Sequence, residues 1–347
     1  MDGGAAGGQP EEVEGPPSGP PPIAGGDNTA GSPVVARSPL SGIIHVIINP
    51  TAGGGHGHGM WATIRAMLPR TGTEYLESTA IAPGQAREAA AAAARAGADV
   101  VVAIGGDGTL NEALNGLMMV AEAQRPAFAF VPGGTANILA RALGLPTDVA
   151  GVGRVLQTGV RRRIDVGRVN DRYFATIAGV GFDAEVVAAA LPLRRWTSGK
   201  PAHVAAALAT LITYRPTTAR IWLDGDEYAG PLTFLAAANT DWYGGGLHIA
   251  PGARADDGRF LMVYGVALSR LETLNVMIRT LSGRHLQHPK VTHRPAAVAT
   301  VESDRPLALH ADGEWLGRWP SFTFQIIPGA LHVIVPRDGS PEQGRRR

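Results

Sequence analysis

The stretch Val100-Val101-Val102-Ala103-Ile104-Gly105-Gly106-Asp107-Gly108-Thr109-Leu110-Asn111-Glu112 decides the fold of this chain. Its first five residues are apolar and predict a fully buried β-strand. After the glycines, apolar residues recur at the spacing of an amphipathic helix. A glycine turn between a strand and a helix presents backbone N–H groups and the positive end of a helix dipole to an anion. We therefore expect the first half of a βαβ unit, with an anion-binding turn at its centre.

Asp107 is the unexpected residue of this turn. A carboxylate repels an anionic phosphate unless a cation or a hydroxyl proton lies between them, so Asp107 suggests a metal–nucleotide site or a proton transfer. A purely structural interpretation is that the aspartate caps the helix that follows. Sequence alone leaves both interpretations open.

Two further glycine turns follow strand-like runs. Residues 43–48 lead into Asn49-Pro50-Thr51-Ala52-Gly53-Gly54-Gly55, and residues 127–131 lead into Pro132-Gly133-Gly134-Thr135-Ala136-Asn137. A repeated strand–turn–helix pattern predicts a parallel sheet with helices on both faces. Ligands of such sheets bind at the carboxyl ends of the strands, so we expect all three turns to converge on one cleft.

The second half of the chain has a different texture. Many short strand-like runs with few helical stretches predict a mostly antiparallel, β-sandwich-like domain. We expect a disordered Gly/Pro-rich head at 1–40, an α/β nucleotide-binding domain at 41–160, a β-rich domain at 161–336 and a flexible tail at 337–347. The final run, 331–335, is compatible with a strand that packs back onto the first domain. The arginines at 161–163 are interpreted as a solvated linker.

Composition excludes several classes of protein. The 347 residues contain no cysteine, so disulfides, thiolate metal sites and cysteine nucleophiles are absent. A formal net charge of +1 is far from a nucleic-acid-binding signature, so no nucleic-acid partner is predicted. No uncharged apolar run reaches the about 18 residues of a membrane span, and the first residues lack a signal-peptide pattern. A cytoplasmic protein is expected, with peripheral contact at the inner membrane face as an option.

The turns match none of the common phosphate-binding signatures. Gly106-Asp107-Gly108-Thr109-Leu110-Asn111 lacks the third glycine of the dinucleotide fingerprint. The chain also has no Gly-x-x-x-x-Gly-Lys-Ser/Thr and no protein-kinase motifs.

The order of the three turns resembles the catalytic domain shared by diacylglycerol kinases, sphingosine kinases and bacterial soluble lipid kinases. The resemblance continues downstream in Gly179-Val180-Gly181-Phe182-Asp183-Ala184, in Asp257-Gly258 and in Asp312-Gly313-Glu314, so that it covers about residues 41–336. NAD kinases share the Gly-Gly-Asp-Gly turn, but Pro132 to Asn137 and the downstream motifs favour the lipid kinases. The resemblance implies an N-terminal α/β domain of the NAD-kinase and diacylglycerol-kinase type.

The resemblance also implies ATP-dependent phosphorylation of a lipid hydroxyl, with ATP and Mg²⁺ as cofactors. For catalysis it points to Glu314 as the base that accepts the hydroxyl proton, with Asp107 as the rival base or the metal-side carboxylate. The nucleotide-binding positions that it implies are Asn49, Thr79, Gly105, Gly106, Asp107, Gly108, Thr109, Leu110, Asn111, Glu112, Gly133, Gly134, Thr135 and Asn137. For Glu314, an ordinary exposed hairpin acid is the alternative, since Asp-Gly pairs favour hairpin turns.

A structural metal site of the bacterial branch resembles the stretch 251–257. Here it leaves Asp257 and the backbone carbonyl of Ala255, with Gly252 at a position where that branch often has an acid. These are few protein oxygens for a divalent cation.

The predicted partners are a lipid substrate, diacylglycerol or a related lipid, and transiently a membrane surface, and a homodimer is left open. Two alternative functions remain from the sequence. One is a catalytically weak lipid-binding or regulatory protein of the same fold, and the other is an NAD-kinase-like enzyme.

Overall fold

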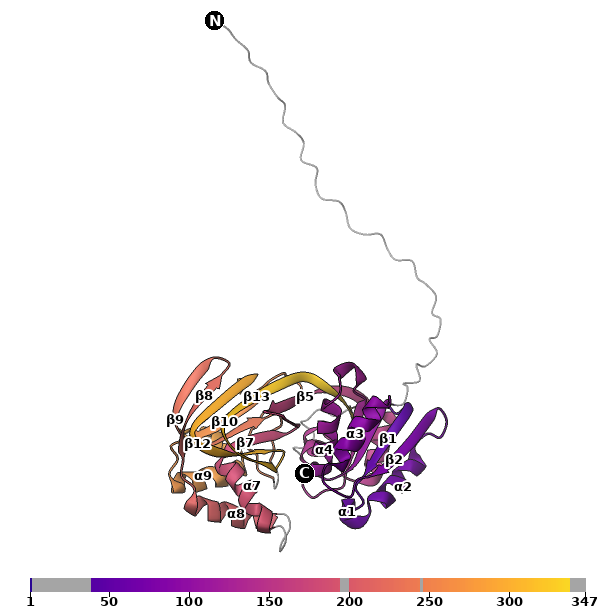
Figure 1. Cartoon of the computed structure of the whole chain (residues 1–347), viewed down its shortest axis with the longest axis horizontal. Coiled ribbons are helices and arrows are strands. Elements are labelled where there is room, and N and C mark those ends of the chain that lie inside the picture. Colours follow the sequence, from indigo (N-terminus) through magenta and orange to yellow (C-terminus); the bar gives the residue numbers. More distant parts are fainter. Residues whose placement is uncertain (2–38, 194–199, 244–245, 338–347) are drawn as a thin grey trace, which may run out of the picture. The chain divides into compact units, whose positions relative to one another are not determined.

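The computed structural model describes Met1 and residues 39–193, 200–243 and 246–337 (Figure 1). Most of the predicted head at 1–40 and tail at 337–347 lies outside these residues. The N-terminal elements are β1 (Gly42–Ile48), α1 (Ala52–Gly55), α2 (Gly57–Met67), β2 (Thr73–Thr79), α3 (Gln85–Arg95), β3 (Val100–Gly105), α4 (Asp107–Met118), η1 (Glu122–Gln124), β4 (Ala127–Pro132), α5 (Ile138–Ala142) and α6 (Val149–Thr158).

The N-terminal strands form a parallel sheet in the order β4-β3-β1-β2. Every residue of β3 and β4 is buried, because helices cover both faces of the sheet. The crossovers from β1 to β2 and from β2 to β3 run in opposite directions, so right-handed connections place α2 and α3 on opposite faces. α4 packs on α3, and α6 packs on α2. This is the predicted α/β architecture.

The remaining elements build an antiparallel β-rich region. They are β5 (Val160–Val169), β6 (Arg172–Phe174), β7 (Ile177–Gly181), α7 (Phe182–Leu193), α8 (Lys200–Thr213), β8 (Thr217–Leu223), β9 (Asp226–Ala238), β10 (Phe260–Val266), α9 (Arg270–Thr280), η2 (Arg284–Gln287), β11 (Val291–Ala296), β12 (Val298–Ala311) and β13 (Glu314–Val335). One core lies among the strands, around Phe174, Phe260, Phe322 and Phe324. A second core lies under the helices α7 and α9, around Phe182 and Val276. The predicted sandwich-like class is confirmed.

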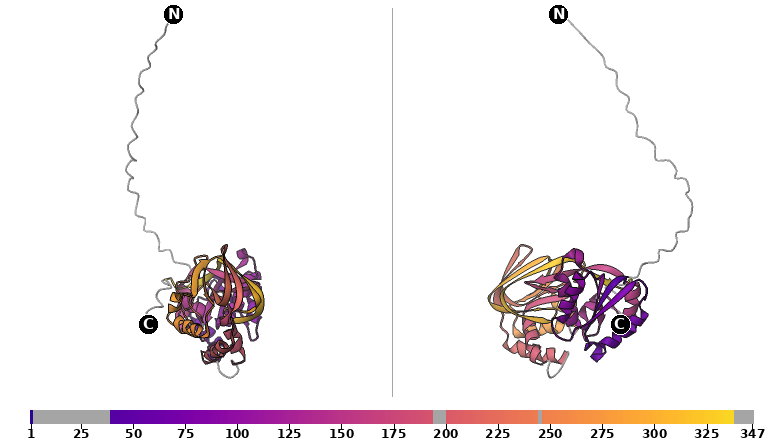
Figure 2. Two further views of the ribbon diagram at one scale, coloured as in Figure 1. Left: turned by 90° about the vertical axis from the view of Figure 1, so that its left-hand side faces the viewer. Right: turned by 45° about the vertical axis from the view of Figure 1, so that its right-hand side comes forward.

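The long strand β13 joins the two regions. Its first part pairs with β12, and its last part pairs with β5 and contributes a parallel bridge from Val333 to Phe128 of β4. Leu331, Val333 and Val335 accordingly belong to the hydrophobic core of the N-terminal sheet. The ribbon of β13 runs from the C-terminal strands to the N-terminal region in Figure 1 and in the right-hand view of Figure 2.

The interpretation of the arginines at 161–163 as a linker is wrong. Arg161, Arg162 and Arg163 lie in β5 and pair with Ile334, Val333 and His332 of β13. Their partner strand comes at the far end of the chain, so no local pattern could reveal it. The helix α6 and the strand β11 were likewise not expected.

The helices α7, α8 and α9 gather on one side of the C-terminal strands (Figures 1 and 2). None of the helices in the described ranges is both long and apolar enough to cross a membrane.

Candidate active site

The three glycine turns converge at the carboxyl edge of the parallel sheet. The Gly133 N–H donates to the Gly105 carbonyl at 2.8 Å, and the Gly53 N–H donates to the Gly133 carbonyl at 2.8 Å. A Cβ on Gly134 would lie 2.6 Å from the Cα of Gly106, so the second and third turns approach too closely for any side chain there. The convergence predicted from the strand–turn–helix pattern is therefore present.

Asn49 links the first turn to the helix of the second. Its Nδ2 donates to the Thr109 hydroxyl at 3.0 Å, and its Oδ1 accepts from the Thr51 N–H at 3.0 Å and the Thr51 hydroxyl at 2.7 Å. Thr109 in turn lies against Gly105, where a Cβ would come within 2.4 Å of the Thr109 Cβ. Asn49 therefore fixes the relative position of two turns through its side-chain amide.

Asp107 is the first residue of α4, and its carboxylate spans to the next helix. One oxygen accepts the Asn137 N–H at 2.9 Å and the other accepts the Ile138 N–H at 2.7 Å, at the start of α5. α4 itself begins without a side-chain cap. The structural interpretation from sequence thus had the wrong partner, because Asp107 satisfies the N-terminus of α5 and not that of its own helix.

Asn137 completes this contact. It adopts a left-handed conformation with φ of +48°. Its side-chain amide exchanges two hydrogen bonds with the Gly134 backbone, each of 2.9 Å. Asparagine tolerates this conformation better than most residues do. The third turn is therefore held in the shape that presents its N–H groups to Asp107.

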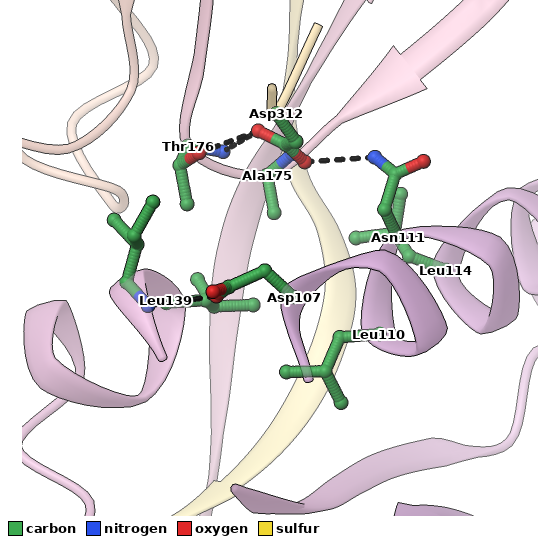
Figure 3. Close-up of a pocket in the computed structure, with 9 residues that line it drawn as sticks. Asp107, Leu110, Asn111, Leu114, Leu139, Ala175, Thr176 and Asp312 are labelled. Atoms are coloured by element: carbon green, nitrogen blue, oxygen red, sulfur yellow. Dashed lines mark hydrogen bonds between the residues drawn. The ribbon is translucent and has the colours of Figure 1, made fainter. Parts of the chain in front are cut away.

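A small pocket separates Asp107 from Asp312, which belongs to the hairpin between β12 and β13 (Figure 3). Its lining residues are Asp107, Leu110, Asn111, Leu114, Ile138, Leu139, Ala175, Thr176 and Asp312. Burial raises the pKa of the Asp107 carboxyl, and the negative charge of Asp312 adds to this effect, while the N–H donors from Ile138 and Asn137 oppose it. The pocket therefore has acidic groups on both sides.

Asp312 is held by donors from two parts of the chain, the connection between β6 and β7 and the helix α4. Its carboxylate accepts the N–H groups of Ala175, Thr176 and Ile177 at 2.8, 2.9 and 3.2 Å and the Thr176 hydroxyl at 2.5 Å. It also accepts Nδ2 of Asn111 on α4 at 2.8 Å. Asp312 therefore connects the C-terminal hairpin with the helix that carries Asp107.

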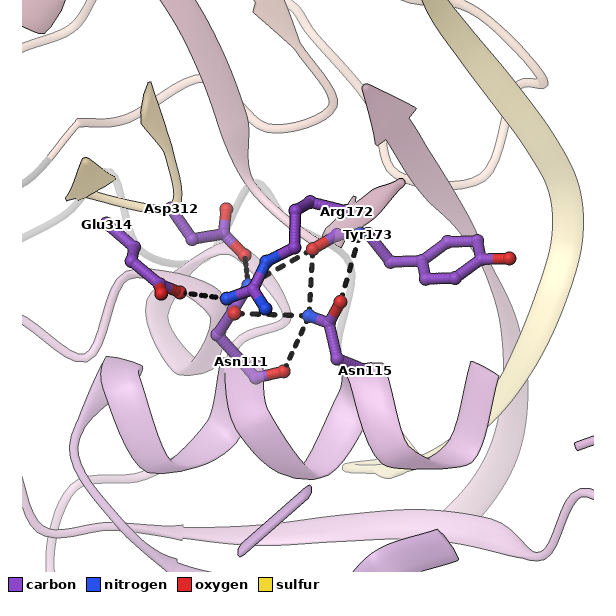
Figure 4. Close-up of polar contacts among 6 residues, drawn as sticks. All are labelled: Asn111, Asn115, Arg172, Tyr173, Asp312 and Glu314. Carbon is purple, nitrogen blue, oxygen red and sulfur yellow. Dashed lines mark hydrogen bonds and ion pairs between the residues drawn. The ribbon is translucent and has the colours of Figure 1, made fainter. Parts of the chain in front are cut away.

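Glu314 follows on the same hairpin. The turn residues Asp312 and Gly313 have φ of +49° and +77°, and Ala311 pairs with Glu314 across it. The Glu314 side chain is 51% exposed and forms an ion pair of 2.5 Å with Arg172 (Figure 4). Glu314 is thus a hairpin acid, and it is also brought near the pocket by the turn that holds Asp312.

Sequence reasoning missed Asn115 and Arg172. Asn115 donates to the carbonyls of Asn111 and Tyr173, both at 2.9 Å, and accepts the Tyr173 N–H at 3.0 Å (Figure 4). Two asparagines four residues apart among the apolar positions of a helix are a usable signal, because they share one face. Arg172 carries no such signal, since its partner Glu314 is remote in sequence.

Three further residues that were predicted to bind the nucleotide, Thr79, Thr135 and Glu112, are exposed or half-buried. Thr79 ends β2 opposite Ile48 and is exposed, one strand outside the first turn. Thr135 is exposed in the third turn, and Glu112 is half-buried on α4. Their assignment as nucleotide-binding residues stays a prediction.

The stretch containing Asp257 and Ala255 is organised around Asp165. The Asp165 N–H donates to the Ala255 carbonyl at 2.7 Å, and the Asp165 carboxylate accepts the N–H groups of Gly258 and Gly329. Burial raises the pKa of Asp257, and the charge of Asp165 contributes. Within the described ranges no group of three or more His, Asp or Glu is arranged to hold a metal ion. The metal assignment to Asp257 and Ala255 therefore stays a prediction.

Known proteins resemble both regions of the chain. The sequence pattern of the diacylglycerol kinase catalytic domain matches residues 44–169, and the pattern of the YegS C-terminal NAD kinase beta sandwich-like domain matches residues 176–335. Among solved structures, a diacylglycerol kinase from Bacillus anthracis superimposes with a TM-score of 0.66 at 19% identity, covering 87% of this chain and 99% of the other. This likeness shows the fold.

Curated relatives match over nearly their whole length. The diacylglycerol kinase of Bacillus subtilis is 30% identical over 294 residues, which cover 84% of this chain and 96% of that protein. The diacylglycerol kinase of Staphylococcus saprophyticus is 29% identical over 298 residues, covering 86% and 97%. The two family patterns together include the three glycine turns and the hairpin of Asp312. The chain therefore belongs to the diacylglycerol kinase family.

Proposed function

We propose that this chain is an ATP-dependent lipid kinase that transfers the γ-phosphate to a hydroxyl of diacylglycerol. The relatives that match over most of the chain are named diacylglycerol kinases. The observation that carries the proposal is the placement of Asp107, which joins two glycine turns and faces Asp312 across a pocket. We assign the triphosphate and the acceptor hydroxyl to the surroundings of the Asp107 carboxylate.

The nucleotide is assigned to the glycine turns. The first N–H groups of α4 precede its first internal hydrogen bond, from Leu110 N–H to the Gly106 carbonyl, and they suit phosphate oxygens. Gly105, Gly106, Gly108, Gly133 and Gly134 allow the backbone to approach a phosphate closely.

The residues present fit Mg²⁺. Asp107 supplies two hard carboxylate oxygens, each of which accepts one backbone hydrogen bond and keeps a lone pair for a cation. The carboxylate of Asp312 already accepts five hydrogen bonds, so it contributes negative charge on the other side of the pocket and no free lone pair. When bound, Mg²⁺ neutralises phosphate charge during phosphoryl transfer. Asp107 is the carboxylate assigned to hold it, because its two backbone donors fix its orientation.

Glu314 is assigned as the base. Its carboxylate is more exposed than that of Asp107 and is oriented by Arg172 and by the adjacent turn. A base must be within hydrogen-bond reach of the hydroxyl whose proton it accepts. A half-exposed carboxylate on a hairpin is accessible to a lipid headgroup, whereas both oxygens of Asp107 accept backbone hydrogen bonds at the start of α5.

The test is transfer of labelled γ-phosphate from ATP to diacylglycerol in detergent micelles, with phosphatidic acid measured by chromatography. Asp107→Asn keeps the side-chain volume and one acceptor oxygen, and we expect turnover to fall about 10³-fold. The melting temperature should fall as well, because the amide nitrogen leaves one N–H at the start of α5 without an acceptor, so folding of the variant is checked by circular dichroism. Turnover within a few-fold of wild type in a folded variant would contradict the role of Asp107.

Two acceptor controls separate the alternatives. Transfer to NAD⁺ in place of lipid would identify an NAD-kinase-like enzyme. No transfer to any acceptor, together with lipid that co-purifies with the protein, would identify a lipid-binding protein of the same fold. The proposal also includes transient contact with the inner membrane face, because diacylglycerol resides in bilayers. A homodimer is left open, and sedimentation of the enzyme tests for it.

A further inference from the structure

A fully buried histidine lies on the strand that leads into the active-site hairpin. His310 belongs to β12, stands two residues before Asp312 and is 0% exposed. Its Nε2 lies 2.5 Å from the hydroxyl oxygen of Tyr243 and 3.4 Å from Oδ2 of Asp183. Tyr243 comes after β9 in the chain, and Asp183 lies at the start of α7. Three polar side chains from three elements therefore meet at one point, and we call them the polar triad.

The hydroxyl of Tyr243 is the centre of the polar triad. It donates to Oδ2 of Asp183 at 2.7 Å, because an ionised carboxylate offers only acceptors. Its oxygen then accepts from His310, so the proton of the neutral imidazole is assigned to Nε2. Burial raises the pKa of Tyr243 well above its usual range, and the charges of Asp183 and Asp312 add to this effect, so the phenol keeps its proton. The hydrogen bonds therefore run from His310 to Tyr243 and from Tyr243 to Asp183.

The polar triad occupies the space above Gly179, which pairs with His310 across the sheet. A Cβ on Gly179 would overlap Oδ2 of Asp183 and would lie 2.8 Å from both the Tyr243 hydroxyl and Nε2 of His310. Gly179 is not among the glycines with positive φ, so this position requires a glycine for space and not for backbone conformation. Any side chain there would displace the polar triad.

The loop after β9, which carries the phenol of the triad, is attached to the active site at a second point. The N–H groups of Asn239 and Thr240 donate to the Thr176 carbonyl at 2.8 and 3.2 Å, and the N–H and hydroxyl of Thr176 donate to Asp312. The strands β9, β7 and β12 pair side by side, and α7 follows β7 directly (Figure 1). The end of β12 is therefore held at His310 by the triad and at Asp312 by Thr176.

We propose that Tyr243 is a positioning residue of the kinase, whose hydroxyl fixes His310 and thereby the end of β12 from which Asp312 and Glu314 project. This proposal rests on the proposed function, because it concerns the placement of the assigned base. A catalytic base must lie within hydrogen-bond reach of its proton, and a displacement of about 1 Å can lower a rate about 10²-fold. The hydrogen bonds of the triad stay within the C-terminal region, whereas the nucleotide is assigned to the glycine turns. Loss of the triad should therefore lower kcat and leave the KM for ATP unchanged.

The experiment compares Tyr243→Phe with Tyr214→Phe in the labelled-ATP assay, below the melting temperature of each variant. Tyr214 is the matched control, because its hydroxyl is also enclosed near the start of α7, against Gly181, but has no hydrogen-bond partner among the described residues. For Tyr243→Phe we expect kcat to fall at least about tenfold, with the KM for ATP within about twofold of wild type. For Tyr214→Phe both parameters should stay within about twofold of wild type. Equal kinetics of the two variants would overturn the proposal.

A second pair of variants, at His310, decides the question if Tyr243→Phe fails to fold. His310→Gln keeps an N–H that can donate to the Tyr243 oxygen, whereas His310→Leu fills a similar volume and has no donor. We expect kcat of His310→Gln to stay within about threefold of wild type and kcat of His310→Leu to fall at least about tenfold. Equal losses in both variants would overturn the proposal, because packing alone would then explain them.

Amide hydrogen exchange separates this proposal from the proposed function, since it needs no activity. The N–H groups of Ala175 and Thr176 donate to Asp312, so in Tyr243→Phe they should exchange at least about tenfold faster than in wild type, while those of β3 keep the wild-type rate. Unchanged exchange at Ala175 and Thr176 would overturn the positioning role. A wild type that phosphorylates no lipid would contradict the proposed function, and faster exchange in the variant would then still support the link from Tyr243 to the hairpin.

Discussion

Two hairpins of the C-terminal region carry nearly the same sequence. Asp224-Gly225-Asp226 joins β8 to β9, and Asp312-Gly313-Glu314 joins β12 to β13. Both aspartates and both glycines have positive φ, and both third residues pair with an arginine, Arg294 and Arg172 respectively. The backbone of a tight turn therefore follows from the Asp-Gly pair in each case.

The carboxylates of the two hairpins differ in what they bind. Asp224 is exposed and accepts the N–H groups of Ala297 and Val298, where β12 begins. Asp312 binds the β6–β7 connection and α4, and it lies close enough to raise the pKa of Asp107. The same short motif is thus structural in one place and part of a site in the other, and the surroundings decide which.

The largest expected difference is in catalysis. Glu314→Gln removes the assigned base and should lower turnover about 10³-fold, since a positioned general base contributes about 10²–10⁴. Asp226→Asn, the matched change on the other hairpin, should leave turnover unchanged. The labelled-ATP assay measures both, and a loss below tenfold for Glu314→Gln would make Glu314 an ordinary hairpin acid.

The next difference is in stability. Asp312→Ala leaves its backbone donors and Asn111 without an acceptor and should lower the free energy of unfolding by about 3 kcal/mol. Asp224→Ala should cost only about 1 kcal/mol, because water reaches its donors. Urea unfolding of both variants checks this, and equal losses would show that the Asp312 network contributes no more than a surface turn.

The pH dependence is a smaller effect. Burial and the charge of Asp312 raise the pKa of Asp107, so the folded protein holds that proton more tightly than an ordinary aspartate does. If ionised Asp107 is required, activity falls as the pH drops through this raised pKa, by up to about tenfold per pH unit. The acid limb of kcat/KM should therefore lie above the ordinary aspartate range, about 3.9, and a limb at or below it would contradict the assignment.

The smallest expected difference concerns the two arginines. Arg172→Gln should reduce turnover about fivefold by releasing Glu314, because a partly exposed ion pair contributes about 1 kcal/mol. Arg294→Gln, on the other hairpin, should have no effect on turnover. Adding salt to wild type should reproduce part of the Arg172→Gln effect, and a salt-independent rate would indicate that Arg172 does not orient Glu314.

The same contrast explains what sequence could predict. Periodicity and glycine placement predicted the parallel sheet and the convergence of its three turns, because strand–turn–helix units are encoded locally. The contacts between Asn111 and Asp312, and between Arg172 and Glu314, join residues far apart in the chain. Residue types alone do not determine such pairings, and for the same reason the arginines of β5 were mistaken for a linker.

The strand β13 has a consequence for how this protein is made. It begins at Glu314 beside the active site and ends at Val335 in the core of the N-terminal sheet. During synthesis, the N-terminal sheet therefore lacks one of its own strands until almost all of the chain described here has left the ribosome. A fragment that ends before 330 would expose Phe128 and its neighbours along an open sheet edge, which favours aggregation. The order of translation thus delays completion of the N-terminal sheet until the strands of the C-terminal region exist.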